Sequence, residues 1–208
     1  SGSYVVPLEN LGVRFRPEMG GRFAAEFPHV HGPAWRVDLE YLRFDNPNES
    51  RLKVRRKIET KRGFRDVEFL LPGLDMKLEM AGASVHALFG LVKADPVEAR
   101  LDLGFGIYRW FSKRGAYYDS LFIDTTGVGD LQLAVDLKVP EVTQVDWSGG
   151  FHAGIDIDVA LVGPLHAGVG AGYRLIAGEL WPALALDLEN VSGFQLLDIR
   201  LSLTARLP

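Results

Sequence analysis

The feature that most constrains this chain is a strict two-residue alternation of apolar and polar side chains. In LDIRLSLTARL (197–207), every odd position holds Leu, Ile or Ala, and every even position holds Asp, Arg, Ser or Thr. Successive side chains of a β-strand point to opposite faces, so this pattern indicates a strand with one apolar face. The same alternation recurs at 35–41, 101–107, 131–139, 151–161 and 165–175. The chain is therefore predicted to be all-β.

The connections between these segments alternate in length. Short turns rich in Gly, Pro and Asp are expected at 29–33, 94–98, 126–130 and 162–164. Longer joins are expected at 44–78, 112–117, 140–150 and 177–193. This rhythm is typical of antiparallel strands that run up and down. We predict eight to ten strands, near 10–17, 21–29, 34–44, 79–93, 99–111, 118–125, 129–139, 150–162, 164–176 and 193–207. No linker divides the chain, so residues 1–208 are expected to form a single domain.

The composition of the polar face decides which face points outward. Glycine accounts for 23 of 208 residues, and on the polar face it alternates with alanine and single charges. A water-facing sheet would carry Lys, Glu, Thr and Gln there, because glycine weakens a strand and covers nothing. If the apolar face meets lipid instead, the small residues allow a narrow barrel to close and the charges can pair inside it. The alternative is a soluble β-sandwich or barrel that binds lipid or a partner.

Charge and composition exclude several other classes. The net charge of -4 argues against a general nucleic-acid-binding protein. The chain has no cysteine, which excludes disulfides and thiolate metal sites. No run of about 18 apolar residues is present, so no transmembrane helix is expected.

Several segments resemble the small outer-membrane β-barrel proteins of Gram-negative bacteria. They are FAAEFPHVHGPAWRVDLEYLRF (23–44), GVGDLQLAVDL (127–137), GPLHAGVGAGYRL (163–175) and FQLLDIRLSLTARLP (194–208). The resemblance implies an antiparallel up-and-down transmembrane β-barrel in a bacterial outer membrane. Members of this group usually end in an aromatic residue, whereas this chain ends Arg206-Leu207-Pro208.

In such a barrel the polar face would line the interior. Buried charges must pair or meet water, so the interior is expected to be a salt-bridged plug, or else a narrow polar path for small solutes. The residues predicted to form this lumen network are Arg36, Asp38, Glu40, Asp102, Asp136, His152, Asp156, Asp158, His166, Arg174, Asp198 and Arg200.

A basic run follows the third predicted strand. RLKVRRKIETKRGFR (51–65) holds eight basic residues and one Glu, and we expect a hairpin that protrudes from the bilayer at about 44–78. It is either a solvated arm or a site for a polyanion such as lipopolysaccharide phosphate. The candidate polyanion-binding residues are Arg51, Lys53, Arg55, Arg56, Lys57, Lys61, Arg62 and Arg65.

The expected function is non-enzymatic: a structural barrel, or a narrow conduit or binding site for small or amphipathic molecules. A second alternative is an outer-membrane lipid hydrolase, for which Ser84 and His86 are the one local Ser/His pair. No acid to orient this histidine is visible in the sequence. We expect no metal and no cofactor, membrane lipid with lipopolysaccharide as a candidate partner, no nucleic acid, and a monomer.

Overall fold

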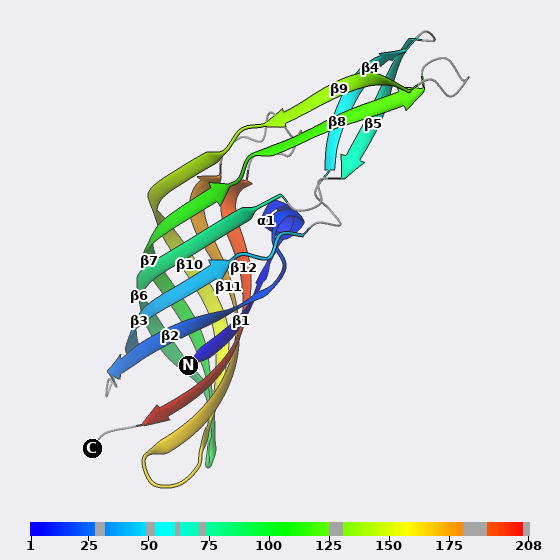
Figure 1. Ribbon diagram of the computed structural model, residues 1–208. Coiled ribbons are helices and arrows are strands. Elements are labelled where there is room, and N and C mark those ends of the chain that lie inside the picture. Colours follow the sequence, from blue (N-terminus) through cyan, green and yellow to red (C-terminus); the bar gives the residue numbers. More distant parts are fainter. Residues whose placement is uncertain are drawn as a thin grey trace.

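Eight antiparallel strands close into a barrel through a ring of hydrogen bonds (Figure 1). The computed structural model describes residues 1–27, 32–48, 53–60, 63–70, 74–124, 131–180 and 191–205. The barrel strands are β1 (Gly2–Pro7), β2 (Glu18–Phe27), β3 (Ala34–Phe44), β6 (Met76–Ala94), β7 (Val97–Arg114), β10 (Val142–Ala160), β11 (Leu165–Leu180) and β12 (Val191–Ala205). Each of these strands pairs with the barrel strand that precedes it in the chain, and β1 pairs with β12 to close the ring. The predicted all-β, up-and-down barrel of eight to ten strands is confirmed, with eight strands.

Two hairpins stand apart from the barrel sheet. One is formed by β4 (Lys53–Thr60) and β5 (Gly63–Leu70), and the other by β8 (Tyr117–Asp124) and β9 (Leu131–Val139). Both extend from the same end of the barrel (Figure 1). We call this the long-connection end, and the opposite end, where residues 95–96 and 161–164 make tight turns, the short-turn end. Among the described residues, the structure contains no helix with the length and apolarity needed to cross a bilayer.

The prediction that 118–125 and 129–139 are barrel strands is wrong. These segments pair with each other as β8 and β9, while β7 pairs directly with β10 over eighteen residue pairs from Val97–Val159 to Arg114–Val142. Alternation indicates a strand but does not name its partner. The predicted joins at 112–117 and 140–150 are likewise largely strand, because β7 continues to Arg114 and β10 begins at Val142.

The prediction of a first strand at 10–17 is also wrong. The chain begins with β1 and then forms a short helix, α1 (Glu9–Arg14), at the long-connection end (Figure 1). Pro7, which has no N–H group, ends the strand. Leu11 and Arg14, three positions apart, are the buried residues of α1, as expected for one face of a helix.

The apolar face of the barrel points outward. Leu201 is 69% exposed, whereas Arg200 next to it is 4% exposed. The same holds on β10 and β11, where Ile157 and Val169 are exposed while Asp156 and Arg174 are buried. A water-soluble β-domain has the opposite arrangement, so the outer surface is suited to hydrocarbon.

This polarity reverses toward the long-connection end. On β7 the outward residues run from Leu103, Phe105 and Ile107 to Arg109, and the inward residues change from Asp102 to the fully buried Trp110. Strands β3 and β6 change in the same way at the same level, because Leu42 pairs with Met80 and Met80 with Trp110. Above this level, the inward side chains of these three strands are mostly apolar and their outward side chains are mostly polar. Such a change is expected where the solvent outside a sheet changes from hydrocarbon to water.

The apolar core above this boundary closes the barrel interior. Trp110 packs edge-on against Phe194 with ring centroids 5.3 Å apart, and its indole N–H donates to Ser148 Oγ at 2.9 Å. Leu11 of α1 joins the same cluster. Complete burial of each large apolar side chain contributes about 1.5–3 kcal/mol. The other members include Val5, Phe15, Leu42, Phe44, Leu74, Met76, Leu78, Met80, Tyr108, Ile176, Leu180 and Leu196.

A lysine on the apolar belt tests this boundary. Ile155→Lys places a charge near the middle of the belt and is expected to destabilise the protein folded in a phospholipid bilayer by about 2–4 kcal/mol. Val145→Lys, on the same strand and also exposed, lies beyond the boundary and should cost about 0–1 kcal/mol. Urea titration of both variants in vesicles measures the difference. Equal effects would mean that the belt is not in hydrocarbon.

Candidate functional site

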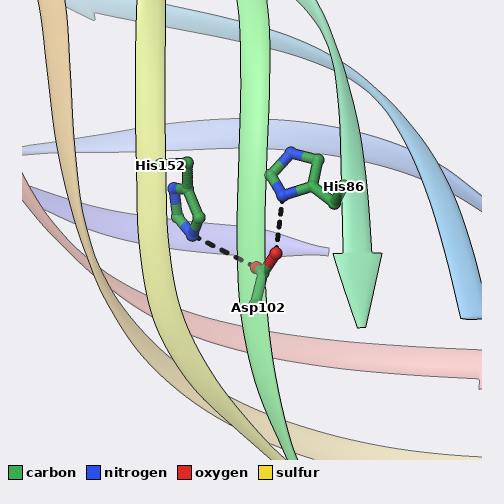
Figure 2. A group of neighbouring side chains, drawn as sticks. All are labelled: His86, Asp102 and His152. Atoms are coloured by element: carbon green, nitrogen blue, oxygen red, sulfur yellow. Dashed lines mark hydrogen bonds and ion pairs between the residues drawn. The ribbon is translucent and has the colours of Figure 1, made fainter. Parts of the chain in front are cut away.

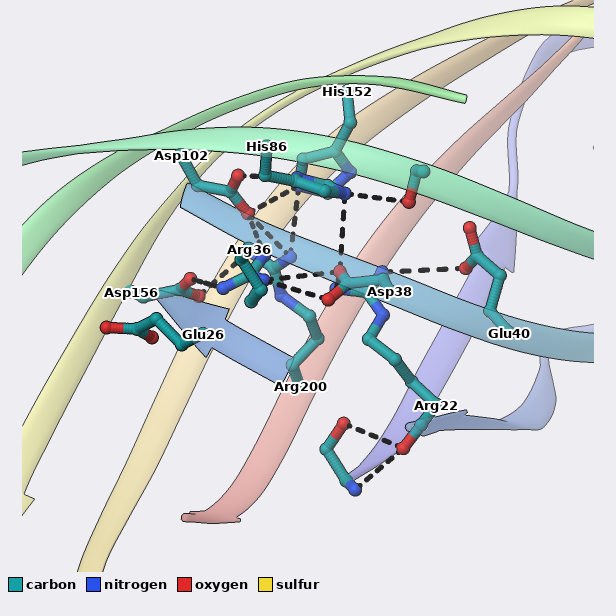
Figure 3. Close-up of polar contacts among 12 residues, drawn as sticks. Arg22, Glu26, Arg36, Asp38, Glu40, His86, Asp102, His152, Asp156 and Arg200 are labelled. Atoms are coloured by element: carbon teal, nitrogen blue, oxygen red, sulfur yellow. Dashed lines mark hydrogen bonds and ion pairs between the residues drawn. The ribbon is translucent and has the colours of Figure 1, made fainter. Parts of the chain in front are cut away.

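The barrel interior below the apolar core holds a connected set of charged side chains. Their strands present them because every second residue of a barrel strand points inward. Arg36 on β3 lies at the centre (Figure 3), with its guanidinium 2.6 Å from Asp102 Oδ2, 2.8 Å from Asp156 Oδ2 and 3.0 Å from Asp38 Oδ1. Arg200 on β12 binds the same pair, at 3.0 Å from Asp102 and 2.9 Å from Asp156. Residues from β3, β7, β10 and β12 are thus joined across the interior.

Two further groups extend this network along the barrel. Toward the apolar core, Arg174 lies 2.6 Å from Glu40 and 2.8 Å from Asp198, and Arg22 bridges Asp38 and Glu40 at 3.2 and 3.5 Å.

Toward the short-turn end, Arg100 lies 2.5 Å from both Glu26 and Asp158. Each of these five arginines therefore contacts at least two carboxylates. A buried ion pair offsets its desolvation only with such close geometry and multiple hydrogen bonds, so the network is arranged to hold charges in place.

One of the predicted lumen residues lies outside the barrel, and another lies at the rim of its interior. Asp136 is on β9, which is outside the barrel, so its assignment to the lumen is wrong; the alternation identifies a strand, but that strand belongs to a hairpin. His166 is on β11 at the short-turn end, half-buried and opposite Ala160 and Thr204. The other ten predicted residues lie in the barrel interior.

Sequence reasoning left five interior residues out of the network. They are Arg22, Glu26, Ser84, His86 and Arg100, all of which point inward. The inward position of Arg22 and Glu26 could have been predicted from Phe23 and Phe27. These apolar residues belong on the outward face of β2, which places their neighbours Arg22 and Glu26 on the inward face. Arg100 lies two residues before Asp102, and so on the same face.

Three of the interior residues form a compact histidine–carboxylate group (Figure 2). Asp102 accepts from His86 Nδ1 at 2.6 Å and lies 3.1 Å from His152 Nε2, and the ligand atoms of all three residues lie within 4.8 Å of one another. The same Asp102 carboxylate binds Arg36 and Arg200. Two adjacent guanidinium groups repel a metal cation, so the arrangement favours ion pairing over metal binding.

Ser84, His86 and Asp102 also have the connectivity of a serine-hydrolase triad. Ser84 Oγ lies 2.8 Å from His86 Nε2, and Asp102 supplies the orienting acid that the sequence did not reveal. However, Asp38 Oδ2 lies 3.2 Å from the same Nε2. The Asp38 carboxylate therefore competes with the Ser84 hydroxyl for this ring nitrogen, which a serine nucleophile would need to itself. Ser84 is also buried, so the geometry favours a structural role.

Glycines on the inward face leave space for the charged side chains of neighbouring strands. Gly104 is the cross-strand partner of His86, and Gly170 is the partner of Asp156. A Cβ on either glycine would overlap the side chain of its partner. The glycines that alternate along β11 thus lie beneath the aspartates that alternate along β10.

The predicted polyanion-binding residues lie on the first hairpin or outside the described residues. Arg51, Lys61 and Arg62 fall outside them, and the rest lie on β4 or β5. Lys57 is exposed and stands opposite the exposed Asp66 in the strand register. Polyanion binding by this hairpin remains a prediction.

One comparison with known proteins, that with solved structures, finds a similar fold. No family model matches the chain, and no curated protein matches it significantly. Among solved structures, the crystal structure of Neisserial surface protein A (NspA) is similar, with a TM-score of 0.51 and 13% sequence identity over 99% of this chain and 93% of that chain. The chain thus has a fold like that of this small outer-membrane β-barrel.

Substitution of a network glycine tests the interior packing. Gly104→Ala would force the His86 ring away from Asp102 and is expected to lower the free energy of unfolding by about 1–3 kcal/mol. The control is Gly21→Ala, because Gly21 has no other group within 4 Å of the added carbon and should change stability by less than about 0.5 kcal/mol. Denaturant unfolding in detergent micelles compares the two. A similar, small effect for both would show that the His86 ring is not held as described.

Proposed function

We propose that this protein is an integral outer-membrane barrel with a sealed interior, acting as a structural anchor and not as a pore or an enzyme. The observation that carries the proposal is the reversal of side-chain polarity along β3, β6 and β7. An apolar exterior over a charged interior suits a lipid-embedded segment, and a polar exterior over an apolar core suits a segment in water. The closed ring also pairs the backbone groups that hydrocarbon would leave unsatisfied.

The two zones of the interior support the sealed state. In the lower zone, arginine–carboxylate pairs cross the barrel from strand to strand. In the upper zone, Trp110 and Phe194 are at most 1% exposed and pack together beneath the long-connection end. Ions need a continuous polar path, and this apolar zone interrupts it. A narrow conduit is therefore less well supported than a plug.

The orientation in the membrane follows from the connections of the barrel. In outer-membrane barrels the short turns face the periplasm and the longer connections face the outside. The short turn at residues 161–164 would then be periplasmic, and the hairpins β4–β5 and β8–β9 would project from the cell surface. The anchor would thus present two hairpins to the exterior.

Heat-modifiable migration tests membrane insertion. Folded in detergent, the unheated protein should migrate faster on an SDS gel than the boiled protein, because a closed barrel resists SDS. Expression without detergent should give aggregated protein that needs refolding into micelles. Stable, monodisperse protein in buffer alone would support the soluble β-sandwich and contradict the proposal.

Planar-bilayer recording tests the seal. The inserted protein is expected to give no stepwise conductance, because the apolar cluster closes the long-connection end of the barrel. Insertion in the same sample is verified by protease protection, so that a lack of conductance is not mistaken for a lack of inserted protein. Discrete, reproducible openings would contradict a sealed interior and favour the conduit.

A further inference from the structure

The outward face of β6 and β7 carries cations where the apolar belt ends. On β7, Arg109 follows Ile107 as the next outward residue, and Lys113 lies farther toward the long-connection end. On β6, Lys77 points outward and is directly opposite Lys113 in the strand register. Like charges placed directly opposite each other destabilise a sheet, so this position favours a bound anion.

The carboxylates nearby leave part of this charge uncompensated. Lys77 pairs with Glu79 at 2.7 Å, and Lys113 lies 3.8 Å from Glu141. Arg109 is exposed, and within the part of the chain that the structure describes no carboxylate lies within ion-pair distance of it. Its partner in register is the exposed Trp147, a residue type that favours the headgroup level of a membrane. Arg109 is therefore placed to meet a lipid phosphate.

The belt below these cations has a row of small side chains. The outward positions of β6 from residue 81 to residue 87 are Ala81, Ala83, Val85 and Ala87, so alanine fills three of the four. The register places Ala83 between Leu39 of β3 and Ile107 of β7, so larger side chains flank the row on both sides. An extended hydrocarbon chain would contact three strands along this row.

We propose that the β3–β6–β7 face binds lipopolysaccharide of the outer leaflet. Its phosphate meets Arg109, Lys113 and Lys77, and one acyl chain lies along the alanine row of β6. The inference rests on the proposed membrane location and goes beyond it by naming the lipid and the face. Charge complementarity selects this occupant, because a zwitterionic lipid would leave the excess positive charge unbalanced.

Retention of lipid A by the intact protein tests the proposal. The folded protein is reconstituted into phosphatidylcholine nanodiscs that contain lipid A or dephosphorylated lipid A, and native mass spectrometry then measures the lipid bound. Bound lipid A should exceed dephosphorylated lipid A roughly tenfold. The Arg109→Gln/Lys113→Gln variant should lose most of this preference, and Ala83→Leu should lower retention of both lipids.

Two matched controls separate this face from general effects of charge and bulk. Lys93→Gln changes an exposed lysine at the other end of β6, and Ala171→Leu changes an outward alanine on β11. Both should retain lipid A like the parent protein. Equal binding of the two lipids, or equal losses in the controls, overturns the lipid site. A protein that fails to insert, shown by the absence of heat-modifiable migration, overturns the proposed function as well.

Discussion

The structure depends on one constraint: a strand that leaves hydrocarbon and enters water must exchange the polarity of its two faces. The alternation of side chains continues unbroken along β7, from Asp102 and Leu103 to Arg109 and Trp110. What changes is which face carries the apolar side chains, as expected where the solvent outside the sheet changes from hydrocarbon to water. In hydrocarbon an outward Ile or Phe is favourable and charges are sheltered inside, whereas in water the same sheet needs an apolar core. The barrel therefore has two interiors with opposite chemistry, joined at one level.

The charged interior follows from the same constraint. Charged side chains excluded from the lipid-facing surface can be accommodated inside a barrel only if they are paired, because an isolated buried charge is costly. Asp102 shows how far the pairing goes, since it binds Arg36, Arg200 and His86 together. Glycine is the partner that makes this possible in a narrow barrel, as at Gly104 beneath the His86 ring. The ion pairs and the glycines opposite them therefore fill the barrel interior together, and the histidine–carboxylate group is part of this packing.

The alternation in the sequence predicted most strands and both of their faces, because face assignment needs only local information. Partner choice is not local. Leu131–Val139 alternates as well as any barrel strand, yet it pairs with β8 outside the barrel. In the barrel, β7 pairs with β10, which follows this hairpin in the chain. For the same reason, the acid beside His86 could not be found, since Asp102 is brought to it by the β6–β7 register. The helix α1 was missed because its few residues, bounded by Pro7, also fit a short alternating pattern.

A spin-label scan along the outward face of β7 tests the polarity reversal most directly. The chain has no cysteine, so single cysteines at positions 101, 103, 105, 107, 109, 111 and 113 can each carry a label in the reconstituted protein. Labels up to 107 should collide preferentially with oxygen, which concentrates in hydrocarbon, and labels from 109 onward with a water-soluble nickel complex. A uniform preference for the nickel complex along the whole strand would contradict the reversal, because no part of β7 would then face lipid.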